Sequence, residues 1–353
     1  MKKILVINPG ATSTKFAIFD GEELQLDETV QHSIGELKSF ERVADQCQYR
    51  LNLILQAMNK AAISLSQLDV IVARGGLLKP LTGGTYAVNE SMLSDLRQAK
   101  RGEHASNLGA IIADILMKQL GIPAYIVDPV SVDEFEPVAR ISGLPELSRI
   151  SMSHALNSKA VARKAAENIG RNYEEVNLVV AHLGTGISVT PHYKGRMIDV
   201  NNALEEGPFS PDRCGGLPAR SLIKLCYSGR YTEKEMLIKN SGSGGMFAYL
   251  GTKDLRDAEK MADEGDEQAK LVLDAMAYQI IKEIGAMSAV LGGKVDRIVL
   301  TGGMSYSQFL VKAIKEKVEF IAPILVFPGE EEMEALAAGA LRVITGQEQA
   351  LVY

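Results

Sequence analysis

The stretch KILVINPGATSTKFAIFD, residues 3–20, consists of an apolar run, a break rich in Gly, Ser and Thr, and a second run in which Phe16 and Ile18 alternate with other residues. This pattern predicts a strand, a turn and a second strand. The stretch LVVAHLGTGISVT, residues 178–190, has the same plan, and its Gly184 lies 174 residues after Gly10, close to half of the 353-residue chain. A plan repeated at half the chain length indicates a duplicated domain.

Each half continues with an apolar strand that ends in two glycines, VIVARGG at 70–76 and RIVLTGG at 297–303. An amphipathic helix and a third strand are expected after each of them. The third strands are AYIVDP at 124–129 and APILVFP at 322–328. Strands that alternate with helices in this way predict a duplicated α/β fold.

The duplication also predicts where the domains divide. We expect an N-terminal domain over 1–147 and a C-terminal domain over 148–334. The second half has a longer spacing between its hairpin and its double-glycine strand, which indicates an insertion of about 50 residues around 208–265. The last helix, within 335–353, is expected to pack back on the first domain. A cleft between the two domains is the expected ligand site.

Composition and charge exclude several classes of protein. Hydrophobic residues make up 46% and charged residues 23% of the chain, as is typical of a folded globular protein. The net charge is −6 and Trp is absent, so neither a nucleic acid nor a membrane surface is an expected partner. The N-terminus lacks the apolar core of a signal peptide, and no run reaches the roughly 18 apolar residues of a membrane span. We therefore expect a cytoplasmic protein.

Common metal and nucleotide motifs are absent from the sequence. The three Cys and five His show neither C-x-x-C nor H-E-x-x-H spacing, so any metal should be a hard ion that a substrate brings with it. A P-loop would need a second glycine, which GATSTK at 10–15 lacks, and there is no G-x-G-x-x-G, H-R-D or D-F-G. Walker, Rossmann and protein-kinase types of site are therefore excluded.

The two hairpin turns consist of small residues, which let backbone N–H groups approach an anion closely. Tight hairpins need glycine in any case, but two such turns at duplicated positions favour phosphate binding over a purely structural role. The expected donors are Asn8, Gly10, Thr12, Ser13, Thr14 and Lys15 in the first turn and His182, Gly184, Thr185, Gly186 and Ser188 in the second.

Motifs spread over the whole chain carry a family resemblance. They are ILVINPGATSTKFAIFD, VARGG, IVDPV, SMSHALNSKAVARKAAE, VVAHLGTGISV, PDRCGGLPAR, GTKDLRDAE, IVLTGGMSYS and EEMEALAAGALRV. The chain resembles the acetate/butyrate kinase family of the actin, hexokinase and acetate kinase superfamily, and within that family it is most similar to the butyrate kinases. The resemblance implies two ribonuclease-H-like (actin-like ATPase) domains. It also implies ATP and ADP with Mg²⁺ as cofactors, a short-chain carboxylate and its acyl phosphate as substrates, and a homo-oligomer.

A carboxylate acceptor needs cations more than it needs a base. A fatty acid is already ionised at neutral pH, so its approach to a polyphosphate brings two anions together. Arginine side chains that bind both anions through two hydrogen bonds, together with magnesium, are expected to offset this repulsion. Arg74 and Arg213 match family arginines that contact the substrate or the transferring group. His154 matches a histidine that donates to phosphoryl oxygens, and Asp128 matches an aspartate near magnesium and the acyl phosphate.

The resemblance also suggests residues for the metal and the nucleotide. Asn8 and Glu334 match metal-linked positions of the family, and Glu331 and Glu332 are alternatives to Glu334 because all three stand at the start of the final helix. The residues that resemble the nucleotide-binding segments of the family are Asp254, Leu255, Arg256, Gly302, Gly303 and Met304.

Some positions depart from the acetate kinase pattern. Ser153 stands where acetate kinases carry Phe, Thr185 replaces their Asn, and Met304 begins a changed ending of its segment. A smaller residue beside the acyl site favours a longer acid, so we expect an enzyme that reversibly transfers the γ-phosphoryl group of ATP to give butanoyl phosphate and ADP. Alternatives are acetate, propionate or isobutyrate as the acid, a sugar kinase with Asp128 as its base, or a nucleotide-switched actin-like protein.

Overall fold

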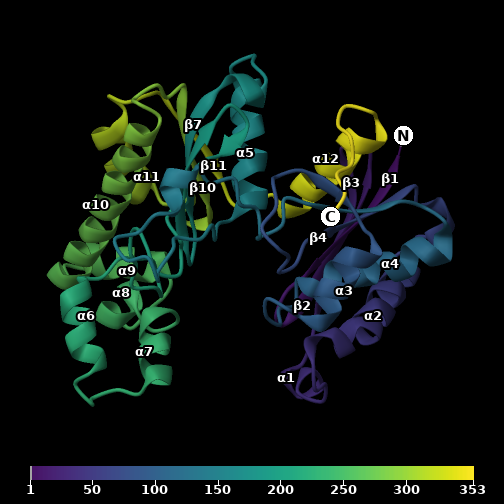
Figure 1. Cartoon of the computed structure of the whole chain (residues 1–353), viewed down its shortest axis with the longest axis horizontal. Helices are drawn as coiled ribbons and strands as arrows, with labels where there is room; N and C mark the ends of the chain where they lie inside the picture. The colour runs from purple at the N-terminus through teal and green to yellow at the C-terminus, as the bar shows by residue number, and fades with distance from the viewer. Residues whose placement is uncertain (1) are drawn as a thin grey trace. The chain divides into compact units, whose positions relative to one another are not determined.

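A computed structural model describes residues 2–353, which divide into two compact units. Unit 1 contains the chain up to Val132 together with Glu331–Tyr353, and unit 2 contains Asp133–Glu330. Figure 1 shows the helices and strands of each unit. None of the helices in residues 2–353 has the length and apolar content that crossing a membrane would require.

Unit 1 is built on a six-stranded sheet in the order β3-β2-β1-β4-β6-β5. The β1–β2 and β2–β3 pairs are antiparallel, whereas β4 runs parallel to β1 and β6 runs parallel to β4. The strands are β1 (Lys3–Pro9), β2 (Ser13–Asp20), β3 (Glu23–Gln31), β4 (Val70–Arg74), β5 (Thr85–Ala87) and β6 (Ala124–Val127). The helices are α1 (Ile34–Leu37), α2 (Cys47–Lys60), α3 (Glu90–Gln98), α4 (Asn107–Leu120) and α12 (Glu332–Ile344).

The sequence of unit 1 explains why its central strands are buried on both faces. Residues 4–7 of β1 and 70–73 of β4 are continuous apolar runs and are fully buried, as parallel strands covered by helices are. Helix α12 contacts β1, β4 and β6. Its Gly339 allows this close approach, because a Cβ at that position would lie 2.5 Å from a methyl group of Val127.

Unit 2 has a five-stranded sheet in the order β11-β10-β7-β8-β9. The strands are β7 (Asn177–Leu183), β8 (Ile187–Tyr193), β9 (Arg196–Met197), β10 (Arg297–Gly302) and β11 (Ile324–Pro328). The helices are α5 (Ala155–Asn168), α6 (Ala219–Cys226), α7 (Glu233–Asn240), α8 (Gly245–Leu250), α9 (Leu255–Asp263), α10 (Glu267–Val290) and α11 (Gln308–Val318).

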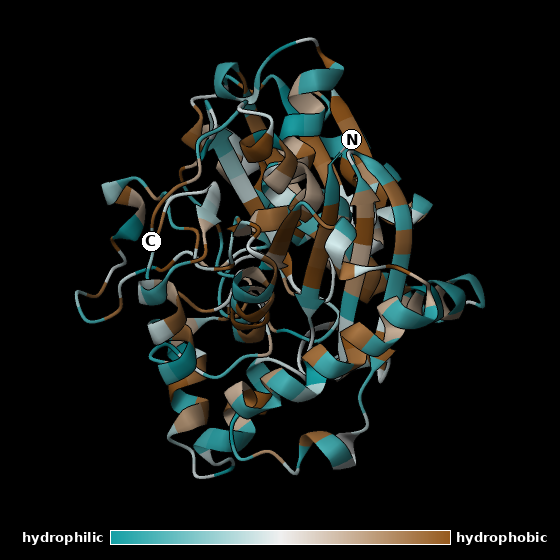
Figure 2. Ribbon diagram, turned by 90° about the vertical axis from the view of Figure 1, so that its right-hand side faces the viewer, coloured by the Kyte–Doolittle hydropathy of each residue, from teal (hydrophilic) through white to brown (hydrophobic). Residues whose placement is uncertain are grey.

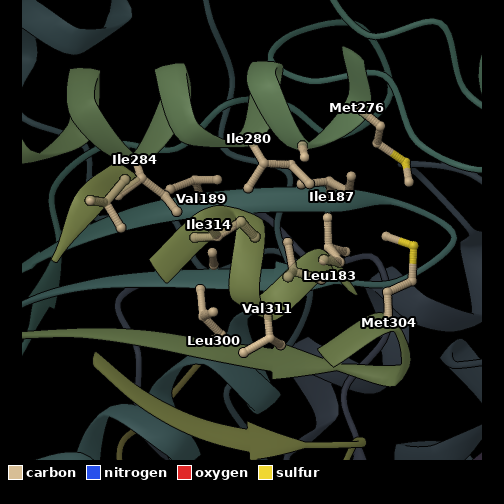
Figure 3. Close-up of a cluster of buried hydrophobic side chains, with 14 of the residues drawn as sticks. Leu183, Ile187, Val189, Met276, Ile280, Ile284, Leu300, Met304, Val311 and Ile314 are labelled. Carbon is tan, nitrogen blue, oxygen red and sulfur yellow. The ribbon is translucent and has the colours of Figure 1, made fainter. Parts of the chain in front are cut away.

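The core of unit 2 lies on both faces of this sheet. On one face, side chains of α10 and α11 such as Ile280 and Ile314 pack against Leu183 and Leu300 of the strands (Figure 3). On the other face, α5 packs its small residues against Val180 and its neighbours. Figure 2 colours the ribbon by hydropathy: several strands carry long brown stretches, and helices show both brown and teal residues, as amphipathic helices packed on buried strands do.

The two sheets share one plan, which confirms the duplicated α/β fold. The antiparallel hairpin β1–β2 followed by the parallel strands β4 and β6 corresponds to β7–β8 followed by β10 and β11. The glycine-rich stretches that start each half therefore form equivalent turns, between β1 and β2 and between β7 and β8.

The chain divides at Asp133, before the expected domain boundary at 147. The physical reason is that the segment after Val132 bonds to residues of unit 2. Glu136 N donates to Ile198 O at 3.0 Å, and the buried Glu134 carboxylate forms a 3.0 Å ion pair with Lys159. In the region 208–265, where the insertion was expected, the structure contains helices α6 to α9.

Candidate active site

The polar residues of unit 1 that the sequence singled out lie where strands end. Asn8 is near the end of β1, Arg74 ends β4, and Asp128 directly follows β6. Because these strands are parallel neighbours, their carboxyl ends meet at one edge of the sheet, which is where open α/β sheets bind ligands. The start of α12 reaches this edge, since Asn8 Nδ2 donates to Glu332 Oε2 at 2.7 Å and Arg74 Nη1 donates to the same oxygen at 3.1 Å.

The glutamate at this edge is Glu332, not Glu334. The helix begins at Glu332, whose side chain is 19% exposed and bonded to Asn8 and Arg74. Glu334 lies two residues further on and is exposed. Two residues along a helix correspond to a rotation of about 200°, so the two carboxylates face opposite sides. Of the three glutamates considered from the sequence, Glu332 is the one that the structure brings to Asn8.

Asp128 is held in an uncommon backbone conformation. Its φ is +36°, in the left-handed region that few residues other than glycine adopt, and its side chain is 2% exposed. Its Oδ1 accepts a 2.7 Å hydrogen bond from Gly84 N, and its own N–H donates to Gly84 O. Strain of this kind persists where the surroundings impose it, which is common at functional sites.

The β1–β2 turn presents the remaining unit 1 residues of the prediction. Thr12 is exposed at the tip, and Ser13 starts β2 and is half-buried. Lys15 is exposed and is the cross-strand partner of Asn8. Directly opposed residues of an antiparallel pair extend to the same face, so Lys15 and Asn8 share one side of the hairpin.

Two stacked histidines lie at the hairpin of unit 2. The rings of His154 and His182 are 3.8 Å apart between centroids and 11° from parallel. His154 Nδ1 lies 3.0 Å from Ser188 Oγ, and His182 Nδ1 lies 2.8 Å from Asn157 Oδ1. The His182 Nε2 atom is 3.1 Å from a carboxylate oxygen of Glu330, and this buried atom has no hydrogen-bond partner among the described residues.

Arg213 lies against the β7–β8 turn. A Cβ at Gly186 would be 2.3 Å from Arg213 Nη1, so only glycine leaves room for the guanidinium there. The same nitrogen donates to Ala203 O at 3.3 Å. Burial lowers the pKa of Arg213, and nearby Asp212 partly offsets the effect, but the group stays protonated at neutral pH. The structure therefore brings a cation to the glycine turn, as phosphate binding requires.

A pocket of about 1430 Å³ opens beside this turn within unit 2. Seven residues expected to bind a nucleotide line it: Gly184, Thr185, Asp254, Leu255, Arg256, Gly303 and Met304. Gly302 lies directly before them with a φ of +88°, and a Cβ there would lie 2.4 Å from Leu183 O. Gly302 therefore shapes the turn by close packing.

The Asp254 and Arg256 side chains form a local pair at the rim of the pocket. Arg256 donates to both oxygens of Asp254, and Asp254 also caps α9 by accepting from Arg256 N at 2.9 Å. These hydrogen bonds lower the pKa of Asp254 to about 2. Arg256 is 87% exposed at its side chain, so its charge remains accessible to a bound anion.

Comparisons with known proteins give the family of this chain. The model of the acetokinase family matches residues 149–346, more than half of the chain. The chain belongs to the acetokinase family. It is 52% identical over 352 residues to butyrate kinase 2 of Clostridium acetobutylicum, covering 99% of both chains.

Solved structures show the acetokinase fold over nearly the whole chain. Acetate kinase of Porphyromonas gingivalis superposes with a TM-score of 0.80 at 18% identity, covering 98% of this chain and 100% of that one. A propionate kinase of Francisella tularensis superposes with a TM-score of 0.76 at 18% identity, covering 96% and 99%. Because the identity is only 18%, these two similarities establish the fold alone.

The donors at the edge of unit 1 suit the magnesium ion expected for an acetokinase. Within residues 2–353, no group of three or more His, Cys, Asp or Glu is placed to hold a metal. Magnesium does not need such a group, because it keeps several waters and binds through one or two carboxylates plus substrate phosphates. The Glu332 carboxylate beside the Asn8 amide fits that requirement.

Several residues near this candidate site were not singled out from the sequence. Asn157, in the first turn of α5, bonds to His182, and the pocket wall includes Tyr306 and Phe309, which are 67% and 38% exposed. Large aromatic residues left exposed in a pocket wall are suited to stack on a base. Their position after the double-glycine strand end could have suggested them, whereas nothing in the sequence points to Asn157.

Proposed function

We propose that this acetokinase reversibly transfers the γ-phosphoryl group of ATP to butyrate, giving butanoyl phosphate and ADP. The observation that carries the proposal is the 52% identity to a butyrate kinase over almost the whole of both chains. Two features of the molecule support it: the nucleotide-sized pocket of unit 2 and the paired Arg74, Asn8 and Glu332 of unit 1.

The transfer itself needs no general base. An ionised carboxylate oxygen attacks the γ-phosphorus, the bond from that phosphorus to the bridging oxygen breaks, and ADP leaves with the electron pair. The catalytic task is therefore to hold anions together and stabilise charge on the transferring group. Arg74 supplies a guanidinium in unit 1, and Arg213 supplies one in unit 2.

The histidine pair contributes oriented hydrogen-bond donors. Stacking against His182 and the contact with Ser188 fix the ring of His154, so it costs little to align when phosphoryl oxygens arrive. The proposed cofactors are ATP or ADP with Mg²⁺. When bound, magnesium neutralises charge on the phosphates. Glu332 and Asn8 are the residues proposed to hold it, and Asp128 is proposed to lie near it.

The acid preference follows from the size of the acyl site. Ser153 is 6% exposed and its hydroxyl has no hydrogen-bond partner among the described residues. A small residue here, in place of a bulky aromatic one, leaves room beside His154 for a longer chain. Each additional buried CH₂ favours binding by about 0.8 kcal/mol, roughly fourfold, so butyrate should exceed acetate by about 15-fold in kcat/KM.

Hydroxylamine trapping of the acyl phosphate tests the proposal. ATP, Mg²⁺ and one of acetate, propionate, butyrate or isobutyrate are supplied at matched concentrations, with a panel of sugars as the control acceptors. We expect the highest kcat/KM with butyrate or isobutyrate. An absence of acyl phosphate with every acid would refute the kinase assignment, and a preference for acetate would refute the proposed acid.

The proposal includes a homo-oligomer in the cytoplasm, where ATP is available. Helices α6 and α7 have no buried residue, yet they carry large apolar side chains on their surface. Ile223 is 58% and Leu237 is 61% exposed. Exposed apolar residues gathered on one element are typical of an interface. Light scattering on the purified chain, with Ile223→Glu as the disrupting variant, tests the assembly, and a monodisperse monomer would refute it.

A further inference from the structure

Arg50 is a buried cation that the reaction described above does not use. It lies on α2 and is 1% exposed, although arginine side chains are almost never fully buried unless they are paired. The Gln46 side chain accepts from its Nε at 3.1 Å and from its Nη2 at 2.8 Å. These two bonds fix the plane of the guanidinium and direct its outer nitrogens toward the β1–β2 turn.

The other acceptors of Arg50 all belong to that turn. Nη1 donates to Gly10 O at 2.8 Å, to Ser13 O at 3.0 Å and to Thr14 Oγ1 at 3.0 Å. Nη2 donates to Ala11 O at 3.2 Å. Every one of these atoms is a neutral oxygen. Burying a charge without a counter-charge is costly. The cost implies that Arg50 has a role in holding the turn in place.

Peptide geometry determines where the N–H groups of the turn point. In a trans peptide the C=O and the following N–H point in opposite directions, and the described residues contain no cis peptide. The carbonyl groups of Gly10 and Ala11 point inward to Arg50. The N–H groups of Ala11 and Thr12 therefore point away from it, toward the side on which both residues are exposed.

We propose that Arg50 is a positioning residue that holds the β1–β2 turn so that the amides of Ala11 and Thr12 face an anionic oxygen of the substrates. Successive outward N–H groups form an anion-binding concavity. The charge behind the carbonyl oxygens also polarises these peptides and strengthens their N–H donors. Arg50 touches no substrate, and the inference rests on the proposed kinase function.

Lysine cannot take over this task. Arg50 contacts three carbonyl oxygens, a hydroxyl and an amide oxygen with a rigid planar group, whereas an ammonium group is a compact point charge with three donors. Arg50→Lys keeps the charge but loses part of this geometry. Arg50→Met removes the charge at similar length. Comparing the two variants separates the effect of charge from the effect of orientation.

The test measures kcat, the KM for butyrate and the Kd for ADP in the wild type and both variants, with folding checked by circular dichroism and Tm. We expect kcat to fall on the order of 100-fold in Arg50→Met and to be only partly restored in Arg50→Lys. The Kd for ADP should stay within about twofold, because the residues lining the pocket belong to unit 2.

Two further variants distinguish positioning from stability. Met58→Ala removes a side chain that is 1% exposed on the same helix, so it should lower Tm without lowering kcat. Gln46→Leu keeps Arg50 but frees its guanidinium, and should lower kcat about tenfold even if Arg50→Met does not fold.

The inference is overturned if kcat stays within about threefold of the wild type in a folded Arg50→Met, or in Gln46→Leu should Arg50→Met not fold. It is also overturned if the Kd for ADP rises in parallel with the loss of kcat. A wild type that forms no butanoyl phosphate would instead refute the proposed function.

Discussion

A single methyl group added at Gly186 tests whether the position of Arg213 controls the rate of transfer. A Cβ at Gly186 would lie 2.3 Å from Nη1 and 2.7 Å from Cζ of Arg213. Ordinary contact between heavy atoms begins at about 3.5 Å, so the guanidinium has to move by roughly 1 Å. It is the end of a flexible side chain, and Gly186 is not among the glycines with positive φ, so the backbone accepts alanine without strain.

The expected magnitudes differ for rate and stability. A displacement of about 1 Å at a reacting centre lowers kcat on the order of 100-fold. Stability changes little, because the variant loses one hydrogen bond from Arg213 Nη1 to Ala203 O, about 1 kcal/mol, and gains about 0.4–1 kcal/mol from the stiffer unfolded chain. Gly186→Ala should therefore be a folded protein with a slow reaction.

The assay combines steady-state trapping of butanoyl phosphate with calorimetric unfolding. Gly285→Ala is the matched control, since it lies in α10 of the same unit and its Cβ would meet nothing within 4 Å. This control should keep kcat and should gain stability from the better helix propensity of alanine, by about 0.5–1 kcal/mol.

A double variant makes the test sharper. If Gly186→Ala acts only by displacing Arg213, then adding it to Arg213→Ala should cause no further loss of kcat, because the effects of substitutions at contacting residues do not add. Full additivity of the two changes would refute the reasoning. So would a Gly186→Ala enzyme that retains kcat within about threefold of the wild type.

Three further outcomes are expected. Glu332→Gln should lower kcat on the order of 100-fold and raise the Mg²⁺ requirement, while the exposed Glu334→Gln should behave as wild type in the same assay. Phe309→Ala should raise the KM for ATP about tenfold with little change in kcat, measured by varying ATP at saturating butyrate. Burial and the charge of Arg50 lower the pKa of His32 to about 4. Between pH 6.5 and 4 the His32 side chain therefore binds a proton in the unfolded chain but not in the native state. The free energy of unfolding should decline over this pH range, and it should decline less in His32→Gln, as measured by urea titrations.

Much of the fold could be read from local patterns. The apolar runs that became β1, β4, β7 and β10 are buried on both faces, so their hydrophobicity is nearly continuous and easy to recognise. Glycine-rich breaks between such runs marked both turns. The domain division was less accessible, because the segment after Val132 belongs to unit 2, where it bonds to residues such as Ile198 that are distant in the sequence.

The candidate site was predicted in part for the same reason. Residues at strand ends, such as Asn8, Arg74 and Asp128, could be located because strand order brings their positions together. The sequence suggested Glu334 for the metal, with Glu331 and Glu332 as alternatives, and in the structure Glu332 bonds to Asn8. Which of these glutamates faces Asn8 depends on the residue at which α12 begins. An acidic first turn suits any helix, so the sequence does not distinguish between neighbouring glutamates.

The sequence by itself determined that this chain adopts a duplicated α/β fold, with a glycine-rich turn in each copy. Burial patterns and turn residues act locally and therefore remain visible in the order of amino acids. Only the tertiary structure decided that Glu332 meets Arg74, that Asn157 orients His182 and that Arg50 underlies the first turn. Contacts of this kind depend on side-chain direction at positions that are far apart along the chain or buried behind one another, and no local pattern records that direction.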